Sequence, residues 1–186
     1  FKRGIAGAYT NLGMVYGEIG NIVKSQEYLL KAASIFEEAN DKPGLGSCYM
    51  NIGVNFFVQK NFTKALEYYR MATPVFEECK DYYSQGSNIF NIGTIYASNK
   101  EYDKARENMN LALDLYKKAG YSYGMGSCYE NLGVLHYYQK EYKEAEKCFY
   151  SAIEIYNGRG MIDGLLSAYN YLGEIANAQK DFIRAK

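Results

Sequence analysis

The side chains that could bind a metal are few and scattered in this sequence of 186 residues. Its four cysteines form no Cys-x-x-Cys pair, and His136 is the single histidine. Zinc sites need about four closely grouped ligands, commonly arranged in such pairs. Isolated cysteines usually behave as small buried apolar side chains. We therefore expect no metal site and no cofactor, and we expect every cysteine to be reduced: Cys48, Cys79, Cys128 and Cys148.

A set of residues that could carry out catalysis is also missing from the sequence. An enzyme needs a nucleophile, a base and oxyanion donors that converge, or a metal. No glycine-rich phosphate loop follows a predicted strand. Asn61-Phe62-Thr63 fits the glycosylation pattern, but we interpret Thr63 as a helix N-cap. We expect the His136 ring to pack in the core, and we predict that the protein is not an enzyme.

The composition narrows the class of partner. Lys+Arg and Asp+Glu number 21 each, so the net charge is zero, whereas nucleic-acid binders normally carry a basic patch. No apolar run approaches the roughly 18 residues of a membrane-spanning helix. Apolar residues make up 48% of the chain, which is enough for a core. We predict a cytoplasmic protein that binds neither nucleic acid nor membranes, and we interpret the sequence as a piece of a longer chain.

A short motif recurs along the sequence every 40 residues without an insertion. Its copies are Asn11-Leu12-Gly13, Asn51-Ile52-Gly53, Asn91-Ile92-Gly93, Asn131-Leu132-Gly133 and Tyr171-Leu172-Gly173. Later in each repeat an alanine recurs in phase at Ala65, Ala105 and Ala145, with Ser25 in its place in the first copy, and a second alanine recurs at Ala32, Ala72, Ala112 and Ala152. Such a period indicates a repeat protein built from stacked supersecondary units.

Each repeat has the spacing of two helices. Tyr9, Leu12 and Tyr16 fall on one face of a 3.6-residue period, which is typical of a helix. Polar turns are predicted at Gly20-Asn21, Lys60-Asn61, Lys100-Glu101, Lys140-Glu141 and Lys180-Asp181. A glycine inside a helix costs about 1 kcal/mol relative to alanine. The repeated glycine therefore predicts close helix packing, with the Leu-Gly pair meeting the alanine of the second helix.

The run Tyr9-x-x-Leu12-Gly13-x-x-Tyr16, followed by the alanine positions, resembles the tetratricopeptide repeat. The resemblance implies an all-α fold: a right-handed α-solenoid of antiparallel helix pairs with about four and a half repeats. It predicts one array over residues 1–186, with repeats at 1–40, 41–80, 81–120, 121–160 and a partial repeat at 161–186. The usual tryptophan and proline of the family are absent, and the period is longer than the family's 34 residues. We therefore expect longer helices, as in the signalling-type arrays of this family.

The resemblance also implies a binding groove on the concave face, lined by the first helix of each repeat. In the family, the residues that face this groove flank the Leu-Gly pair. Carried onto this sequence, the predicted peptide-binding residues are Asn11, Ser47, Asn51, Val54, Phe57, Ser87, Phe90, Asn91, Ser127, Asn131, Val134 and Tyr138.

The repeated asparagine has two interpretations. An amide side chain offers both a donor and an acceptor, so a row of asparagines can bind the backbone of an extended peptide. Alternatively, each asparagine bonds a neighbouring helix and only supports the fold. The predicted lining contains Glu18, Glu130 and Glu174 and no lysine or arginine. It therefore favours a neutral or basic peptide over one held by its carboxylate.

Two functions follow from these observations. The first is a protein- or peptide-binding module, and the alternative is a sensory or dimerisation segment of a bacterial regulator whose effector domain lies outside this chain. Apolar residues on the terminal helices, among them Phe1, Ile5 and Leu166, are predicted to lie exposed. We expect them to promote contacts between copies of the chain.

Overall fold

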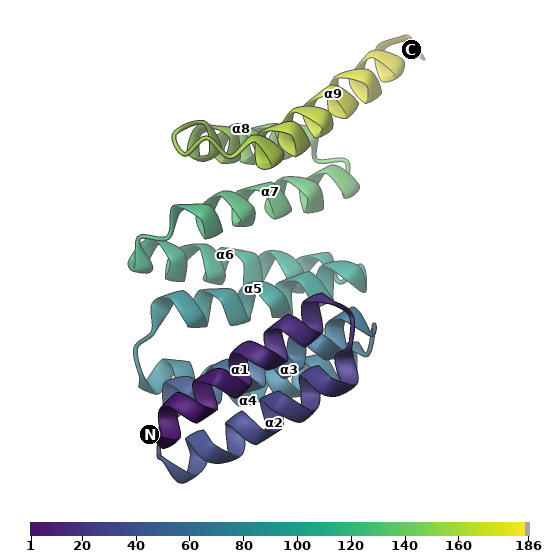
Figure 1. Ribbon diagram of the computed structural model, residues 1–186. Helices are drawn as coiled ribbons and strands as arrows, with labels where there is room; N and C mark the ends of the chain where they lie inside the picture. Colours follow the sequence, from purple (N-terminus) through teal and green to yellow (C-terminus); the bar gives the residue numbers. More distant parts are fainter. Residues whose placement is uncertain (185–186) are drawn as a thin grey trace. The chain divides into compact units, whose positions relative to one another are not determined.

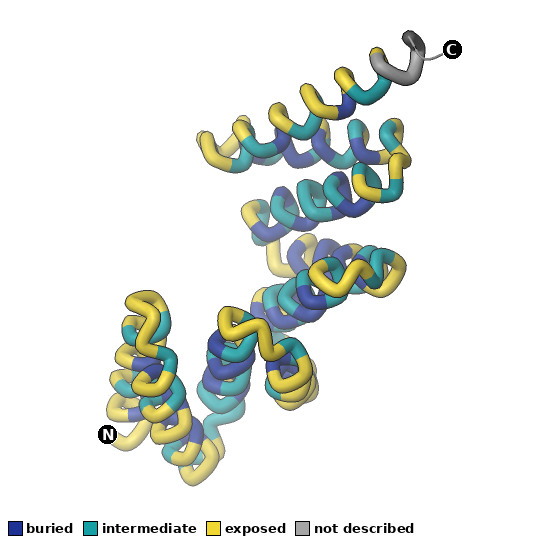
Figure 2. The backbone as a smooth tube through the Cα atoms, turned by 90° about the vertical axis from the view of Figure 1, so that its right-hand side faces the viewer, coloured by how far each residue is buried: buried dark blue, intermediate teal, exposed yellow. Residues whose placement is uncertain are grey.

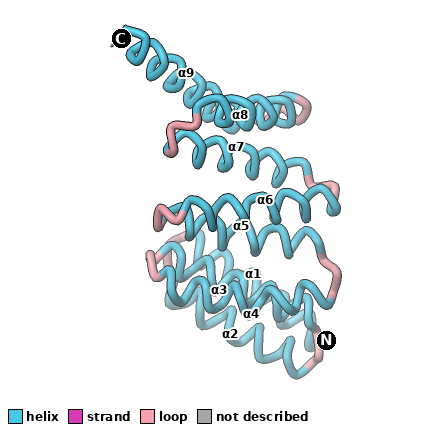
Figure 3. The backbone as a smooth tube through the Cα atoms, turned by 180° about the vertical axis from the view of Figure 1, so that it is seen from behind, coloured by secondary structure: helices cyan, strands magenta, loops and turns pink. Residues whose placement is uncertain are grey.

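The computed structural model of the protein describes the backbone of residues 1–184 and the side chains of residues 1–180. Short turns join nine α-helices, and the described residues contain no strand (Figures 1 and 3). The all-α prediction is confirmed. The helices are α1 (Lys2–Glu18), α2 (Ile22–Glu38), α3 (Lys42–Val58), α4 (Phe62–Glu78), α5 (Tyr82–Ser98), α6 (Tyr102–Ala119), α7 (Ser122–Tyr138), α8 (Tyr142–Asn157) and α9 (Ile162–Arg184).

The chain divides into two compact units, residues 1–95 and residues 96–186, here called the N-terminal and C-terminal units. Their boundary falls within the last turn of α5. In the N-terminal unit α1 packs on α2 and α3 packs on α4. In the C-terminal unit α7 packs on α8, which in turn packs on α9. The single array over residues 1–186 remains a prediction.

The same short turn ends almost every helix, and Figure 2 shows that exposed residues gather at these turns. Its central residue has a positive φ, for example 59° at Lys60. The Lys60 amide donates to the Phe57 carbonyl at 2.8 Å, and the Asn61 amide donates to the Phe56 carbonyl at 2.9 Å. This pair of hydrogen bonds is the Schellman motif, which satisfies the last carbonyls of a helix. The residues with positive φ are Gly20, Asn40, Lys60, Lys80, Lys100, Gly120, Lys140 and Gly160.

In the N-terminal unit, the last residue of each turn begins the next helix. The side chain of Asn61 accepts a hydrogen bond from the Lys64 amide at 3.2 Å, so α4 begins at Phe62. Asn21, Asp41 and Asp81 accept the equivalent bond. The predicted N-cap at Thr63 is wrong because Asn61 already caps this helix, which leaves Thr63 inside the first helical turn.

The predicted turn at Lys180-Asp181 is also wrong, because α9 continues through it to Arg184. At Lys60 and Lys140, the left-handed backbone is accompanied by a second helix that packs back on the first. A lysine in that conformation costs roughly 1 kcal/mol or more, so the turn depends on the packing that accompanies it.

Alanines and glycines let the paired helices approach closely. Ala65, Ala105 and Ala145 are fully buried. A Cβ atom on Gly53 would lie 2.6 Å from the Tyr69 ring, and one on Gly133 would lie 2.8 Å from the Phe149 ring. The prediction of close packing is therefore confirmed. The atoms nearest to such a Cβ belong to Tyr69 or Phe149, the large side chain four residues after Ala65 or Ala145, and beside Gly13 they include the Ser25 carbonyl as well as Leu29.

The cysteines are free, as predicted. Cys48 and Cys128 are fully buried in equivalent places on α3 and α7. Burial raises the pKa of the Cys128 thiol to about 12. Burial also raises the pKa of Cys48, although its contact with the Thr10 hydroxyl, 3.7 Å away, acts in the opposite direction.

Candidate functional site

Two adjoining cavities in the N-terminal unit bring together four of the predicted binding residues. One has a volume of about 270 Å³ and is lined by Asn51 and Val54, together with Met14 and Leu29. The other has a volume of about 300 Å³ and is lined by Val54, Phe57, Asn91, Val58, Tyr69 and Thr94. Val54 and Val58 line both cavities. The result is a mainly apolar surface that carries three amide side chains, Asn51, Asn55 and Asn91, and the carboxylate of Glu18.

The repeated asparagine makes a contact within its own helix. Asn51 Nδ2 donates to the Ser47 carbonyl at 2.9 Å on α3, and Asn131 Nδ2 donates to the Ser127 carbonyl at 2.9 Å on α7. The second interpretation, in which the asparagine supports the fold, placed this contact between neighbouring helices. The observed contact is instead to the preceding turn of the same helix. It orients each amide along its helix and uses one of the two hydrogens that the nitrogen can donate.

A buried polar chain lies beside these cavities, and our sequence analysis missed it. Asn55 Nδ2 donates to Ser25 Oγ at 2.7 Å, and Ser25 Oγ donates to the Gly13 carbonyl at 2.6 Å. Both side chains line the first cavity. The signal was present in the sequence, because Ser25 takes the place of the repeated alanine and Asn55 takes an otherwise apolar place, as at Ile95.

A second buried amide, Asn88 on α5, packs against α4. It donates to the Tyr69 carbonyl at 2.8 Å and to Thr73 Oγ1 at 2.9 Å, while its own Oδ1 is buried without a partner. The equivalent residues elsewhere are Cys48 and Cys128. A buried amide of this kind disfavours other helix registers, because a shifted register would leave its donors unpaired as well.

The C-terminal unit contains a larger cavity, of about 700 Å³, between the end of α8, the start of α9 and one face of α7. Of the predicted binding residues, Ser127 lines it. Its other lining residues are Tyr123, Glu130, Tyr156, Gly160, Met161, Ile162, Asp163 and Gly164. This lining has two carboxylates and two tyrosines, whereas the cavities of the N-terminal unit have one of each, Glu18 and Tyr69, among mainly aliphatic and amide side chains.

Two hydroxyl groups hold the Glu130 carboxylate in this cavity. The Tyr156 hydroxyl donates to Oε2 at 2.7 Å, and Ser167 Oγ donates to Oε1 at 2.6 Å. Burial, together with the hydrogen bond to Glu130, raises the pKa of Tyr156 above that of a free tyrosine. The carboxylate consequently has a fixed position that joins α7 to both α8 and α9.

The remaining predicted residues lie in several surroundings. Asn11 is exposed on α1, and Tyr138 is exposed at the end of α7. Ser47 Oγ and Ser87 Oγ each donate to the carbonyl four residues earlier, at 3.0 Å. Phe90 is half-buried, and Val134 packs on the core cluster that contains Phe149.

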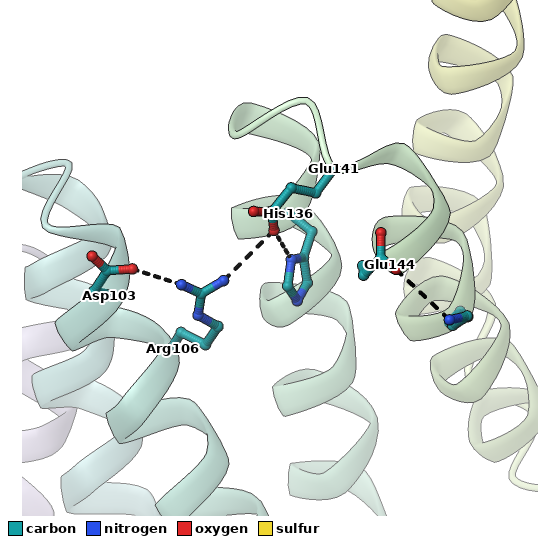
Figure 4. Close-up of polar contacts among 6 residues, drawn as sticks. Asp103, Arg106, His136, Glu141 and Glu144 are labelled. Atoms are coloured by element: carbon teal, nitrogen blue, oxygen red, sulfur yellow. Dashed lines mark hydrogen bonds and ion pairs between the residues drawn. The ribbon is translucent and has the colours of Figure 1, made fainter.

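His136 lies in a group of charged side chains at the end of α7 (Figure 4). Its Nδ1 lies 2.5 Å from Glu141 Oε2, and Arg106 Nη1 lies 3.6 Å from the same oxygen. Arg106 also pairs with Asp103 at 2.6 Å. The His136 side chain is 15% exposed. The ring therefore packs, as expected, but it lies at the edge of the core and has Glu141 as a polar partner. These contacts connect α6, α7 and the first residue before α8.

In the described part of the chain, no group of three or more His, Cys, Asp or Glu side chains is arranged to hold a metal ion. Among the same residues, no helix combines the length and the apolar character needed to cross a membrane.

Comparison with solved structures identifies similar folds. Aspartyl phosphate phosphatase F from Bacillus subtilis has a TM-score of 0.88 at 18% identity, over 100% of this chain and 51% of that chain. A Rap protein complexed with competence and sporulation factor has a TM-score of 0.82 at 15% identity, over 97% of this chain and 54% of that one. A putative kinesin light chain with TPR-like repeats from Podospora anserina has a TM-score of 0.72 at 13% identity, over 100% and 95%.

The chain thus spans about half the length of the first two of these proteins. A search of curated protein sequences gives no match. The matched folds confirm the α-solenoid class. A family model described as tetratricopeptide repeat matches residues 4–78 and 87–158. Because these two segments make up most of the sequence, the chain belongs to the tetratricopeptide repeat family.

Proposed function

We propose that the protein is an interaction module that binds an extended peptide, or an extended segment of a partner protein. One observation carries the proposal: the adjoining cavities in the N-terminal unit, where Asn51 and Asn91 lie among Val54, Phe57 and Val58. Amide groups bond the backbone of a bound segment, while apolar cavities receive its side chains. The same division of roles is common in peptide recognition by folded domains.

The fold comparison supports this proposal. Two of the similar structures are Rap proteins solved with bound partners, one with competence and sporulation factor and one with the Phr* peptide. The second has a TM-score of 0.80 at 16% identity. These ligands belong to those proteins. For the present chain they favour a binding role over catalysis, and we retain the prediction of a cytoplasmic protein.

Substitution of Asn51 tests the proposal. Peptides that bind would first be selected from an array of acetylated ten-residue sequences, and their affinity measured by fluorescence anisotropy. Asn51→Ala should weaken binding by about 1 kcal/mol, the net value of a typical hydrogen bond. The free energy of unfolding should change little, because the amide bonds only its own helix.

Asn108→Ala is a matched control. Asn108 on α6 makes the same contact, to the Lys104 carbonyl at 2.8 Å, and does not line these cavities. It should leave peptide affinity unchanged. If Asn51→Ala reduced stability while peptide affinity stayed the same, the asparagines would be structural and the proposal would fail.

The alternative, a sensory or dimerisation segment of a regulator, is favoured by the exposed apolar side chains of the terminal helices. Leu12 on α1 is 41% exposed, and Leu166 on α9 is 61% exposed. Such patches commonly contact another protein surface. Analytical ultracentrifugation distinguishes this function: dimers that Leu166→Glu abolishes would support it, and a monomer at every concentration would contradict it.

A further inference from the structure

The cavity in the C-terminal unit has an unusual set of charges. Glu130 and Asp163 line it, and the lining described above includes no lysine, arginine or histidine. Arg159, which directly precedes the cavity residue Gly160, donates instead to Ser122 Oγ at 3.0 Å. The cavity therefore presents two carboxylates without a cation among its own walls. An opposite charge on a bound partner would find a complementary surface there.

The Glu130 carboxylate is held ready for such a charge. One hydroxyl donates to each of its oxygens, Tyr156 to Oε2 and Ser167 to Oε1. A carboxylate oxygen accepts about two hydrogen bonds, so each oxygen retains an acceptor site. The forked guanidinium of arginine can donate to both oxygens at once, and a lysine ammonium can donate to one. Because the carboxylate is already held in place, binding of the cation costs the protein little conformational entropy.

The other walls suit the aliphatic part of a basic side chain. Met161, Ile162 and Tyr123 line the cavity, and Tyr123 is 54% exposed. Apolar walls cover the methylene groups of arginine or lysine. A tyrosine ring also attracts a cation that lies over its face. The volume of about 700 Å³ is within the range of about 300–1,000 Å³ that is typical of ligand cavities.

We propose that this cavity binds an arginine or lysine side chain of the extended partner. The inference rests on the proposed function and adds the chemistry of one residue of the ligand. Ser127, which is among the residues predicted to bind the peptide, also lines the cavity, so the basic residue is bound next to the predicted peptide-binding face.

The equivalent place in the N-terminal unit lacks this chemistry. Met50 on α3 takes the place of Glu130, and Phe76 on α4 takes the place of Tyr156. The carboxylate and the hydroxyl that fixes it are therefore absent together. A carboxylate held by a tyrosine at this place is consequently a property of the C-terminal unit.

The experiment uses a blocked pentapeptide with one basic residue, acetyl-Ala-Ala-Arg-Ala-Ala-amide, and the same peptide with neutral citrulline. Methyl-labelled methionines report binding by NMR, because Met161 lines this cavity and Met14 lines a cavity of the N-terminal unit. The arginine peptide should shift the Met161 signal to saturation. The citrulline peptide, and the Glu130→Gln variant with the arginine peptide, should bind at least about tenfold more weakly. Glu107→Gln, on an exposed residue of α6, should bind as the unmodified protein does.

Asp163→Asn is a second variant, to be used if Glu130→Gln does not fold, and should weaken the arginine peptide in the same direction. Equal binding of the arginine and citrulline peptides at Met161 would overturn the inference. So would an unmoved Met161 signal with a shifted Met14 signal, and peptide binding in the N-terminal unit would then stand. A Met161 shift that depends on protein concentration without peptide would assign the cavity to a second copy of the chain and would also overturn it.

Discussion

Residues 44–54 of α3 and residues 124–134 of α7 have nearly the same sequence, but their cavities differ in chemistry. In both helices a glycine, Gly53 or Gly133, packs under an aromatic ring. Their fully buried cysteines, Cys48 and Cys128, are equivalent too. The main chemical difference in this stretch is that Met50 is replaced by Glu130.

This comparison separates two sets of positions. The small residues fix how closely two helices pack, and they are shared by both units. The position beside the repeated asparagine changes from Met50 to the acidic Glu130, with Tyr156 supplying a hydroxyl that bonds the acid. The chemistry of such a position can therefore change while the helix packing stays the same.

The largest expected effect tests whether the packing is shared. Gly53→Ala and Gly133→Ala should each destabilise the protein by about 2 kcal/mol, because the added methyl group overlaps Tyr69 or Phe149. Gly173→Ala should stabilise α9 by about 1 kcal/mol, since no atom lies within 4 Å of the added Cβ. Urea unfolding followed by circular dichroism measures all three. A neutral Gly133→Ala beside a damaging Gly53→Ala would show that the two interfaces differ.

The next effect concerns the hydroxyl that holds Glu130. Tyr156→Phe should cost about 1.5 kcal/mol in free energy of unfolding, the lower value for a hydrogen bond to a charged group. The cost should almost vanish in a Glu130→Met background, which reproduces the side chain of α3. An unchanged cost in that background would mean that the hydroxyl acts independently of the carboxylate.

The same tyrosine predicts a pH dependence. Its pKa in the folded protein is raised by burial and by Glu130, so the unfolded chain loses this proton first as the pH rises. The stabilisation of the folded state that this raised pKa represents is complete below about pH 10, the ordinary tyrosine pKa, and declines above it. The decline between about pH 10 and 11 should be smaller in Tyr156→Phe. An equal decline in both proteins would assign it to other tyrosines.

A smaller effect is expected at the turns, which both units share. Lys60→Gly and Lys140→Gly should each stabilise the protein by about 0.5–1 kcal/mol, because both residues have a positive φ that glycine adopts without strain. Lys147→Gly, inside α8, should instead destabilise by a similar amount. Thermal unfolding provides the measurement, and a loss of stability at Lys60 would show that its side chain contributes more than its backbone costs.

The smallest expected difference lies between the two buried cysteines. Both should react slowly with iodoacetamide at pH 8, since burial raises their pKa values and disfavours the thiolate. Cys128, with a pKa of about 12, should react more slowly than Cys48, whose pKa the Thr10 hydroxyl lowers. Mass spectrometry of timed samples determines the order, and Thr10→Val should remove the difference. Faster reaction of Cys128 would contradict this account.

The repeat period predicted the helix pairs and most of their boundaries. It succeeded because Ala65, Gly53 and their equivalents each satisfy a local packing requirement that recurs unchanged. It failed at Lys180-Asp181, where the residues match earlier turns but α9 continues as a helix to Arg184. A turn of this kind depends on tertiary contacts as well as on its own residues.

The candidate site was predicted less completely. Asn51, Val54 and Phe57 line the cavities of the N-terminal unit, and their role could be predicted because they lie in or close to the repeated motif. Tyr156 and Asp163 could not, because they come from the end of the second helix and the start of the next one, outside the motif. The departures from the repeat are the useful signal for such residues, as Asn55 and Ser25 show in the N-terminal unit.

The turn at every twentieth residue gives each hairpin interchangeable ends. Asn40 and Lys80 have the same backbone conformation, and Asp41 and Asp81 cap the following helices in the same way. Deletion of residues 41–80 would join Asn40 to Asp81 and recreate a turn of the same kind. A gene encoding such a chain can therefore gain or lose a 40-residue segment by unequal recombination without creating an unfavourable junction.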